Sequence, residues 1–248
     1  MFYPFKKRVD QLISKLTQNE TNLGLMYFEE PDYTGHKFGP DSPEMDKKLI
    51  ELDNLIGYFV EQMKDKNLFN STNIIITSDH GMATVELEKF VPISKDIQRL
   101  IDFKKSTFNR MSGLIYPKST KLYSKLKSLQ RDYPMLKVWK KSEIPRYLHY
   151  TNHYRIPSIL ITVKMPYSLK LDRVRVKKGD HGWMSESSSS PSDMYPFFLA
   201  RGPNIAKSEK LISPFENVSV YPLCCKLLHL HPAPNNGSLE GLSPFILT

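Results

Sequence analysis

Cysteine is almost missing from this chain, which contains two such residues among 248. The two are neighbours, Cys224 and Cys225, and their apolar surroundings suit a helix better than a structural disulfide. The pattern excludes a framework of disulfides like the one that stabilises small secreted domains. The two cysteines do not indicate whether the protein resides in an oxidising or a reducing compartment.

Long apolar runs are also missing, and no stretch approaches the roughly 20 residues that cross a bilayer as a helix. The first seven residues do not show the basic-then-apolar order of a signal peptide. The hydrophobic content of 40% and the charged content of 25% are ordinary for a globular protein. We find no internal repeat and no domain boundary, so we expect a single domain with a substantial core.

Acidic residues are fewer than basic ones. The chain has 26 aspartates and glutamates and 35 lysines and arginines, which gives a net charge of +9. Such a balance can indicate nucleic-acid binding. The lysines are scattered, however, over residues 118–141, 177–178 and 207–210, without one basic helix or an aromatic-basic ribonucleoprotein motif. We therefore expect no dedicated nucleic-acid site, and we interpret the charge as a solvated surface with some attraction for anionic substrates or membranes.

Four acceptor sequons for N-linked glycosylation occur, beginning at Asn19, Asn70, Asn217 and Asn236. Sequons also arise by chance. On their own, these sequons weakly favour a secreted or surface glycoprotein.

Helical and extended patterns alternate along the chain, which indicates an α/β fold. Apolar residues recur at helical intervals in residues 5–16 and 45–63, and Ser42 followed by Pro43 has the form of a helix start. Strands are expected at 23–28 and at 73–77, the second apolar and β-branched as if buried on both faces. Strand, helix and strand in this order predict a βαβ unit, and hence a mostly parallel central sheet flanked by helices.

The remaining elements follow from the same patterns. Further strands are expected at 113–116, 158–163 and 197–200, and further helices at 119–129 and 221–230. The Ser-rich residues 185–192 are expected to form a flexible surface loop.

Three short segments place Asp, His or both beside Gly. Asp32 and His36 follow the strand expected at 23–28, and their spacing would put both on one side of a helical turn. Asp79 and His80 end the strand expected at 73–77, and His181 lies between Gly179 and Gly182. Ligand sites in open α/β sheets lie at the carboxyl ends of strands, where the first two segments fall. Each segment alone is more typical of a turn, but together these oxygen and imidazole donors predict a divalent-metal site.

Longer stretches around these segments match the signatures of a known family. Residues 25–32 with 35–36 and 39–40, residues 77–82 and residues 181–183 resemble the three signatures of the ectonucleotide pyrophosphatase/phosphodiesterases. Supporting matches occur at 145–150, 198–203 and 235–239, in the family's order. The resemblance implies an alkaline-phosphatase-like fold, with residues 1–248 forming part of a phosphodiesterase catalytic domain.

The resemblance also implies two zinc ions. Asp32, His36 and His181 would hold one of them, and Asp79 and His80 would contribute to the other. A two-metal centre clamps the attacking and leaving oxygens of an in-line phosphoryl displacement. The implied reaction is hydrolysis of phosphodiester or pyrophosphate bonds in nucleotides or related small diesters. Separately from the resemblance, we expect Tyr154 at the rim of the pocket as a candidate substrate-binding residue, with Lys37 as a second candidate.

The family's nucleophile is a threonine that lies upstream of the helix expected at 5–16. Thr34 and Thr84 lie in or near the signatures, but neither has the context of that nucleophile. We therefore expect a domain that is incomplete at its N-terminus, has no catalytic nucleophile in this chain, and shows little or no activity alone. By resemblance, the expected location is extracellular or at the cell surface, with any membrane anchor outside this chain.

A second class of function remains open beside the enzyme. The absent nucleophile also suits a non-catalytic surface or binding protein that retains the fold, and phosphodiesterase activity of this chain would eliminate that alternative. A basic nucleic-acid-binding module lacks any motif, and salt-sensitive binding of DNA would be needed to support it.

Overall fold

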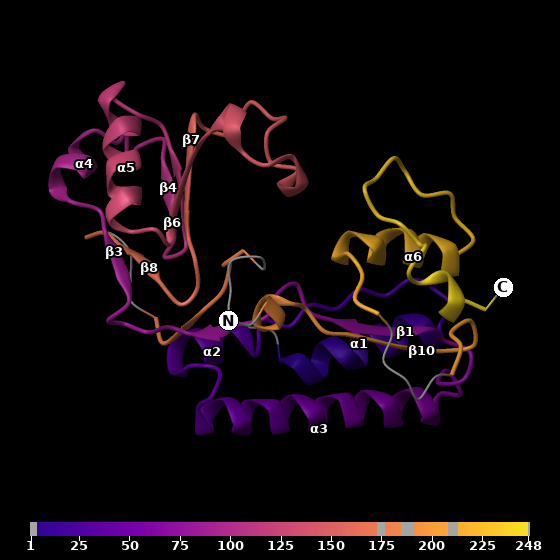
Figure 1. The fold of residues 1–248 in the computed structure, drawn as a ribbon. Coiled ribbons are helices and arrows are strands. Elements are labelled where there is room, and N and C mark those ends of the chain that lie inside the picture. The colour runs from indigo at the N-terminus through magenta and orange to yellow at the C-terminus, as the bar shows by residue number, and fades with distance from the viewer. Residues whose placement is uncertain (1–3, 173–176, 185–190, 208–212, 248) are drawn as a thin grey trace. The chain divides into compact units, whose positions relative to one another are not determined.

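The computed structural model describes residues 4–172, 177–184, 191–207 and 213–247. The chain divides into two compact units (Figure 1). Unit 1 comprises residues 1–31, 46–79 and 196–248, and unit 2 comprises residues 32–45 and 80–195. No described helix is both long enough and apolar enough to cross a membrane.

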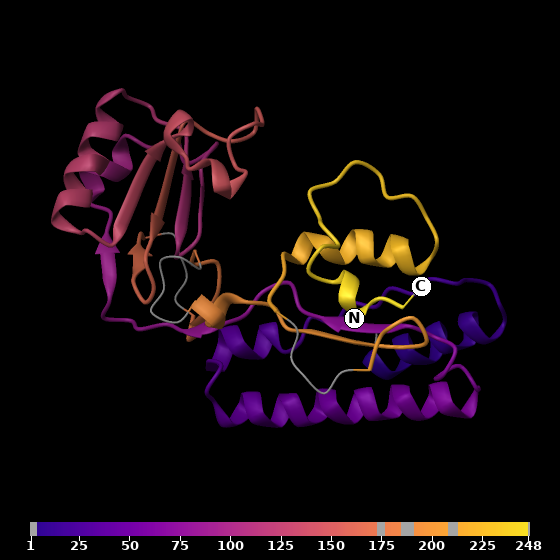
Figure 2. The same ribbon diagram turned by 45° about the vertical axis from the view of Figure 1, so that its right-hand side comes forward.

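Unit 1 packs helices on both sides of a strand pair, as Figures 1 and 2 show. Its elements are α1 (Phe5–Thr17), most of α3 (Pro43–Asp65), β1 (Ile74–Thr77), β10 (Phe198–Arg201) and α6 (Val220–Leu227). Val9 and Ile13 of α1 are buried against Met63 of α3, so the apolar stripes of the two helices meet. The start of α3 is as predicted, because the Ser42 hydroxyl accepts a hydrogen bond from the Met45 amide at 3.2 Å.

The strand expected at residues 23–28 does not form. The segment carries no strand assignment, and no described strand pairs with it; Leu25 and Tyr27 are 83% and 70% exposed. A strand requires a ladder of hydrogen bonds with a neighbour, which apolar alternation alone does not supply. The predicted βαβ unit is therefore wrong, and β1 is only half-buried and pairs antiparallel with β10.

Unit 2 is built around a four-stranded sheet of order β4–β5–β7–β6, in which every pairing is antiparallel. The strands are β4 (Thr107–Phe108), β5 (Ser112–Ile115), β6 (Leu136–Lys140) and β7 (Ile159–Val163). Helix α5 (Lys121–Asp132) covers one face of this sheet, with α4 (Lys95–Arg99) beside it (Figure 1). Leu122 and Leu126 of α5 are fully buried in a core that they share with Leu136 and Val138 of β6.

Shorter elements complete unit 2. They are α2 (Asp32–Phe38), β2 (Ala83–Thr84), β3 (Phe90–Pro92), β8 (Ser168–Lys170) and β9 (Gly179–Asp180), with 3-10 turns at Lys141–Glu143, Arg146–Leu148 and Pro191–Met194. The pair β3–β8 is parallel, whereas β2–β9 is antiparallel.

The prediction of mixed helices and strands is confirmed, and the helices expected at 5–16, 43–63, 119–129 and 221–230 all form within a few residues. The strands expected at 73–77, 113–116, 158–163 and 197–200 form as well. The expected parallel pairing holds only for β3–β8 among the described strands. Of the Ser-rich stretch, residues 185–190 lie outside the described residues, and the rest enters the turn Pro191–Met194.

Candidate metal centre

Helix α2 and strand β9 bring the predicted ligands of unit 2 together. Asp32 begins α2, and His36 follows one turn later; β9 ends immediately before His181. Gly179 allows the close approach of these two elements, and Gly35 leaves room for the side chain of Met82. A Cβ atom on Gly179 would lie 2.5 Å from the Gly35 carbonyl oxygen, and a Cβ atom on Gly35 would lie 2.5 Å from Met82 Sδ.

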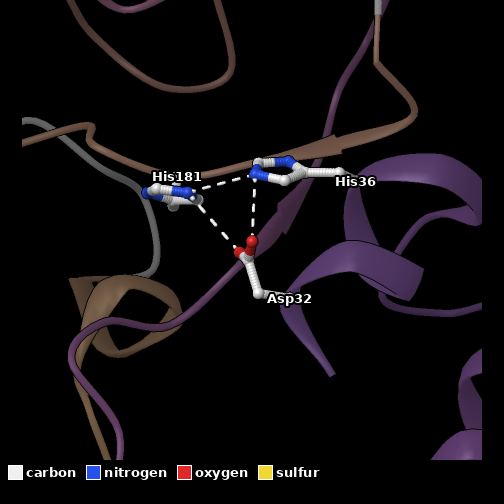
Figure 3. A group of neighbouring side chains, drawn as sticks. All are labelled: Asp32, His36 and His181. Carbon is white, nitrogen blue, oxygen red and sulfur yellow. Dashed lines mark hydrogen bonds and ion pairs between the residues drawn. The ribbon is translucent and has the colours of Figure 1, made fainter. Parts of the chain in front are cut away.

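Asp32, His36 and His181 form a triangle of donor atoms (Figure 3). His36 Nε2 lies 3.4 Å from Asp32 Oδ2 and 3.2 Å from His181 Nε2. His181 Nε2 lies 3.5 Å from Asp32 Oδ1. Zinc bonds of about 2.0–2.2 Å at tetrahedral angles place ligand atoms about 3.3–3.6 Å apart. The separations of the two imidazole nitrogens from each other and from the two oxygens of the Asp32 carboxylate are close to these lengths.

The protonation of His36 is set by its second ring nitrogen. His36 Nδ1 lies 2.9 Å from the carbonyl oxygen of Gly179, which can only accept a hydrogen bond. A neutral imidazole in this position donates from Nδ1, so Nε2 is the ring atom with a lone pair, and it faces Asp32, His181 and Lys177. Ligating histidines are oriented in this way by a carbonyl or carboxylate behind them.

Asp180 lies behind both histidines. Its Oδ1 accepts a hydrogen bond from the His181 amide at 3.1 Å and lies 3.6 Å from His36 Nδ1. The carboxylate is only 9% exposed. Arg110, also buried, interacts electrostatically with Asp180, which opposes the lowering of the Arg110 pKa by burial. Neither Asp180 nor Arg110 was singled out from the sequence, although Asp180 adjoins a predicted ligand.

Lys177 is a further residue that sequence reasoning missed as part of the site. Its Nζ lies 2.9 Å from His36 Nε2 and 3.8 Å from Asp180 Oδ1. The ammonium group places a positive charge beside the donor triangle. The only sequence signal was its membership of a scattered set of lysines.

His80 joins the same cluster. Its ring stacks on that of His181 with 3.5 Å between centroids, and His80 Nε2 lies 4.0 Å from Asp32 Oδ1. Burial lowers the pKa of His181, and the neighbouring His80 lowers it further, although Asp32 opposes this. Both effects favour the neutral imidazole that binds a metal.

The donor set fits a divalent metal. Asp32 Oδ1 is buried and has no hydrogen-bond partner among the described residues, although a buried carboxylate oxygen normally has one. Two imidazole nitrogens and a carboxylate are typical zinc ligands. A cation between them would satisfy the orphaned oxygen.

The other predicted site residues are placed as follows. Asp79 ends the middle segment of unit 1, so its assignment as a ligand stays a prediction. Tyr154 is 78% exposed, and its hydroxyl accepts a hydrogen bond from Arg155 Nε at 3.2 Å. Its assignment to substrate binding also stays a prediction. Thr34 is buried within α2, and the Thr84 hydroxyl donates to Asp41 Oδ2 at 2.6 Å.

Comparison with known proteins places these residues in a family context. Residues 3–184 match the family described as Type I phosphodiesterase / nucleotide pyrophosphatase. The chain is 35% identical over 249 residues to ectonucleotide pyrophosphatase/phosphodiesterase family member 7 of Rattus norvegicus, covering 98% of this chain and 55% of that protein. It is also 35% identical over 241 residues to bis(5'-adenosyl)-triphosphatase enpp4 of Mus musculus, covering 95% of this chain and 51% of that protein. The chain thus spans about half the length of the curated relatives that it matches.

Solved structures agree with the sequence comparison. Murine ectonucleotide pyrophosphatase/phosphodiesterase 5, in an inactive form in complex with AMP, superposes with a TM-score of 0.83 at 31% identity. The match covers 98% of this chain and 64% of that one. This likeness confirms the predicted α/β, alkaline-phosphatase-like fold. The family match over most of the chain shows that this protein belongs to the type I phosphodiesterase / nucleotide pyrophosphatase family.

Proposed function

We propose that this chain contributes a two-metal zinc centre for the hydrolysis of phosphodiester or pyrophosphate bonds in nucleotides or related small diesters. The observation that carries the proposal is the triangle of Asp32, His36 and His181, whose edges of 3.2–3.5 Å suit one zinc ion. Asp79 and His80 are proposed to contribute to a second ion, and the ring of His80 stacks on that of His181. The family match covers residues 3–184 of both units, and the likeness to family member 7 covers 98% of the chain, which supports residues 1–248 as part of one catalytic domain.

The residues of the site have separate roles in this proposal. Asp32, His36 and His181 would hold one zinc ion, which supplies Lewis-acid stabilisation of charge on phosphoryl oxygens. The Gly179 carbonyl group and Asp180 lie against Nδ1 of the His36 imidazole, and Asp180 also accepts a hydrogen bond from the backbone amide of His181. Lys177 adds a positive charge that attracts an anionic phosphodiester.

We propose that the chain by itself has at most very low activity. Thr34 is 6% exposed, and the Thr84 hydroxyl already donates a short hydrogen bond to Asp41. Neither hydroxyl is therefore suited to act as the nucleophile that is expected for this family. The two relatives and the AMP complex support nucleotides as the substrate class. A location outside the cell is proposed from the family resemblance alone.

The proposed zinc centre is tested on the full chain by measuring AMP binding and the hydrolysis of a nucleotide diester. We expect AMP to bind in the presence of Zn²⁺, to lose binding when the metal is chelated, and to bind far more weakly to Asp32→Asn. Titration calorimetry measures binding, and a chromogenic nucleotide diester measures turnover. AMP binding that does not depend on zinc, or that survives Asp32→Asn, would contradict the proposed centre.

The alternative is a non-catalytic binding protein that retains the fold and a metal. The burial of Thr34 and the hydrogen bond of Thr84 favour this alternative as far as the isolated chain is concerned. Zinc-dependent turnover of the diester by this chain, abolished in Asp32→Asn, would eliminate it.

Asp180→Asn tests the residue behind the ligands. The substitution keeps the size of the side chain but removes the charge beside both histidines. We expect the dissociation constant for Zn²⁺ to rise about 10- to 100-fold, as for other outer-shell carboxylates. Competition with a chromogenic chelator measures it, and Asp172→Asn, an exposed residue of the same unit, is the matched control. Equal zinc affinities of the two variants would show that Asp180 does not support the ligands.

A further inference from the structure

Positive charge is concentrated in one part of unit 2. Residues 95–170, all of which the structure describes, contain 17 lysines and arginines but only four aspartates and glutamates. Their net charge is +13, whereas the whole chain carries +9, so the remaining residues are acidic on balance. The excess is therefore local and is not a general property of the surface.

The densest part of this charge lies on the helix α5 and the strand β6 that packs against it. Residues 118–141 contain eight lysines and arginines and a single acid, Asp132. Six of the cations are exposed, and we call them the α5–β6 basic surface: Lys118, Lys121, Lys125, Arg131, Lys137 and Lys140. Among the described residues, only Lys140 of these six has a carboxylate within ion-pair distance, Glu143 at 3.8 Å.

The folding of α5 explains Arg131, which lies in the last turn where the helix dipole favours a cation, but it does not explain the lysines at the start of the helix. Lys121 lies in the first turn, which contains no acidic residue, although the helix dipole favours acids there. Lys121 and Lys125 are four residues apart, so they repel each other along one helix face. These two lysines oppose the local stability of the helix, which is expected when a surface is kept for a ligand.

The basic surface extends around an edge of the sheet. Leu136 and Val138 of β6 face the core beneath α5, so Lys137 between them points to the opposite face. Lys121 and Lys125 lie on α5 itself, and β6 is the edge strand between the two sides. A flexible polymer can follow such a curved surface, whereas a flat bilayer would contact one side of it.

The uncharged residues of this region help to identify which kind of anionic ligand the basic surface suits: a membrane, a nucleic acid or another polyanion. Residues 95–170 expose no large aliphatic side chain of the kind that inserts into a membrane interface; their exposed large hydrophobic residues are tyrosines at 147, 150 and 154. Within residues 118–141, Tyr123, Tyr133 and Trp139 pack against the cores of unit 2. The basic surface therefore lacks an exposed aromatic platform for stacking nucleic-acid bases.

We propose that the α5–β6 basic surface binds a linear sulfated polysaccharide. Lysine ammonium groups attract sulfate oxygens as point charges and require neither base stacking nor apolar insertion. The binding needs no metal and no turnover, so it stands apart from the proposed phosphodiesterase centre.

Heparin is the probe for the test, with the full chain and a variant that carries Lys121→Gln, Lys125→Gln, Lys137→Gln and Lys140→Gln. The matched control carries the same substitution at four exposed lysines of unit 1: Lys7, Lys47, Lys66 and Lys226. Both variants change the net charge equally. We expect the first to bind heparin at least about 10-fold more weakly and the control to change by less than about 3-fold.

The salt dependence of binding gives a second readout. Loss of four contacts should reduce the slope of log affinity against log salt by about 3, since each contact on a linear polyanion releases about 0.7–0.9 counterion. Thermal melting of both variants verifies that they are folded. Unchanged heparin affinity in the first variant, or an equal loss in the control, would overturn the proposal. Tighter binding of single-stranded DNA or of phosphatidylserine vesicles than of heparin at equal ionic strength would overturn the assignment to a polysaccharide.

Discussion

Replacement of His181 by alanine is expected to raise the dissociation constant for Zn²⁺ by at least about 100-fold. Four-ligand zinc sites have binding free energies of about 10–16 kcal/mol, so one ligand accounts for about 3 kcal/mol. His181 Nε2 contributes two of the three edges of the donor triangle, at 3.2 Å from His36 and 3.5 Å from Asp32. Its loss leaves only Asp32 and His36 on one turn of α2. Competition with a chromogenic chelator measures the affinity directly, without reference to turnover.

An exposed histidine outside the cluster provides the control. His231→Ala removes an imidazole from unit 1 and should leave zinc affinity within about 2-fold of the parent. If His181→Ala binds zinc as tightly as His231→Ala does, the triangle is not the metal site. The proposed hydrolase function would then lose its main structural support.

Replacement of Leu126 by alanine is expected to lower the free energy of unfolding of unit 2 by about 2–5 kcal/mol. Leu126 is fully buried between α5 and the sheet, where it shares a core with Leu122, Leu136 and Val138. Removal of three carbon atoms there loses burial of apolar surface and leaves a cavity. Urea unfolding followed by tryptophan fluorescence reports on this unit, because Trp139 and Trp183, the only two tryptophans, both lie in it.

The neighbouring Lys125→Ala is the matched control on the same helix. Lys125 is exposed, so its loss should change the unfolding free energy by no more than about 0.5 kcal/mol. A loss below about 1 kcal/mol for Leu126→Ala would contradict the described packing of α5 on the sheet.

Local elements could be predicted well from the sequence. The helix expected at 5–16 is α1 at Phe5–Thr17, and the start of α3 at Pro43 follows from Ser42 and proline chemistry. The strand expected at 23–28 was wrong, because its pattern is apolar but it has no described pairing partner. Strand direction was also mispredicted, since the order of elements does not specify which strand pairs with which.

The candidate site was predictable in part. The spacing of Asp32 and His36 indicated a shared face, and α2 places both there. The orientation of His36 by Gly179 and Asp180 was not predictable, because these residues lie more than 140 positions away. The glycines of the motifs are typical of turns in the sequence, but Gly179 is needed for the close approach of β9 to the backbone of α2, and Gly35 leaves room for the side chain of Met82.

The sequence by itself determined the types of donor, the local elements that carry them and the excess of positive charge. These properties depend on residue chemistry and on periodicity over one or two turns. Only the tertiary structure decided that His181 lies 3.2 Å from His36 across 145 positions, and that the Gly179 carbonyl group lies against His36 Nδ1. Such proximity results from the packing of segments that are distant in the chain, which no local pattern encodes.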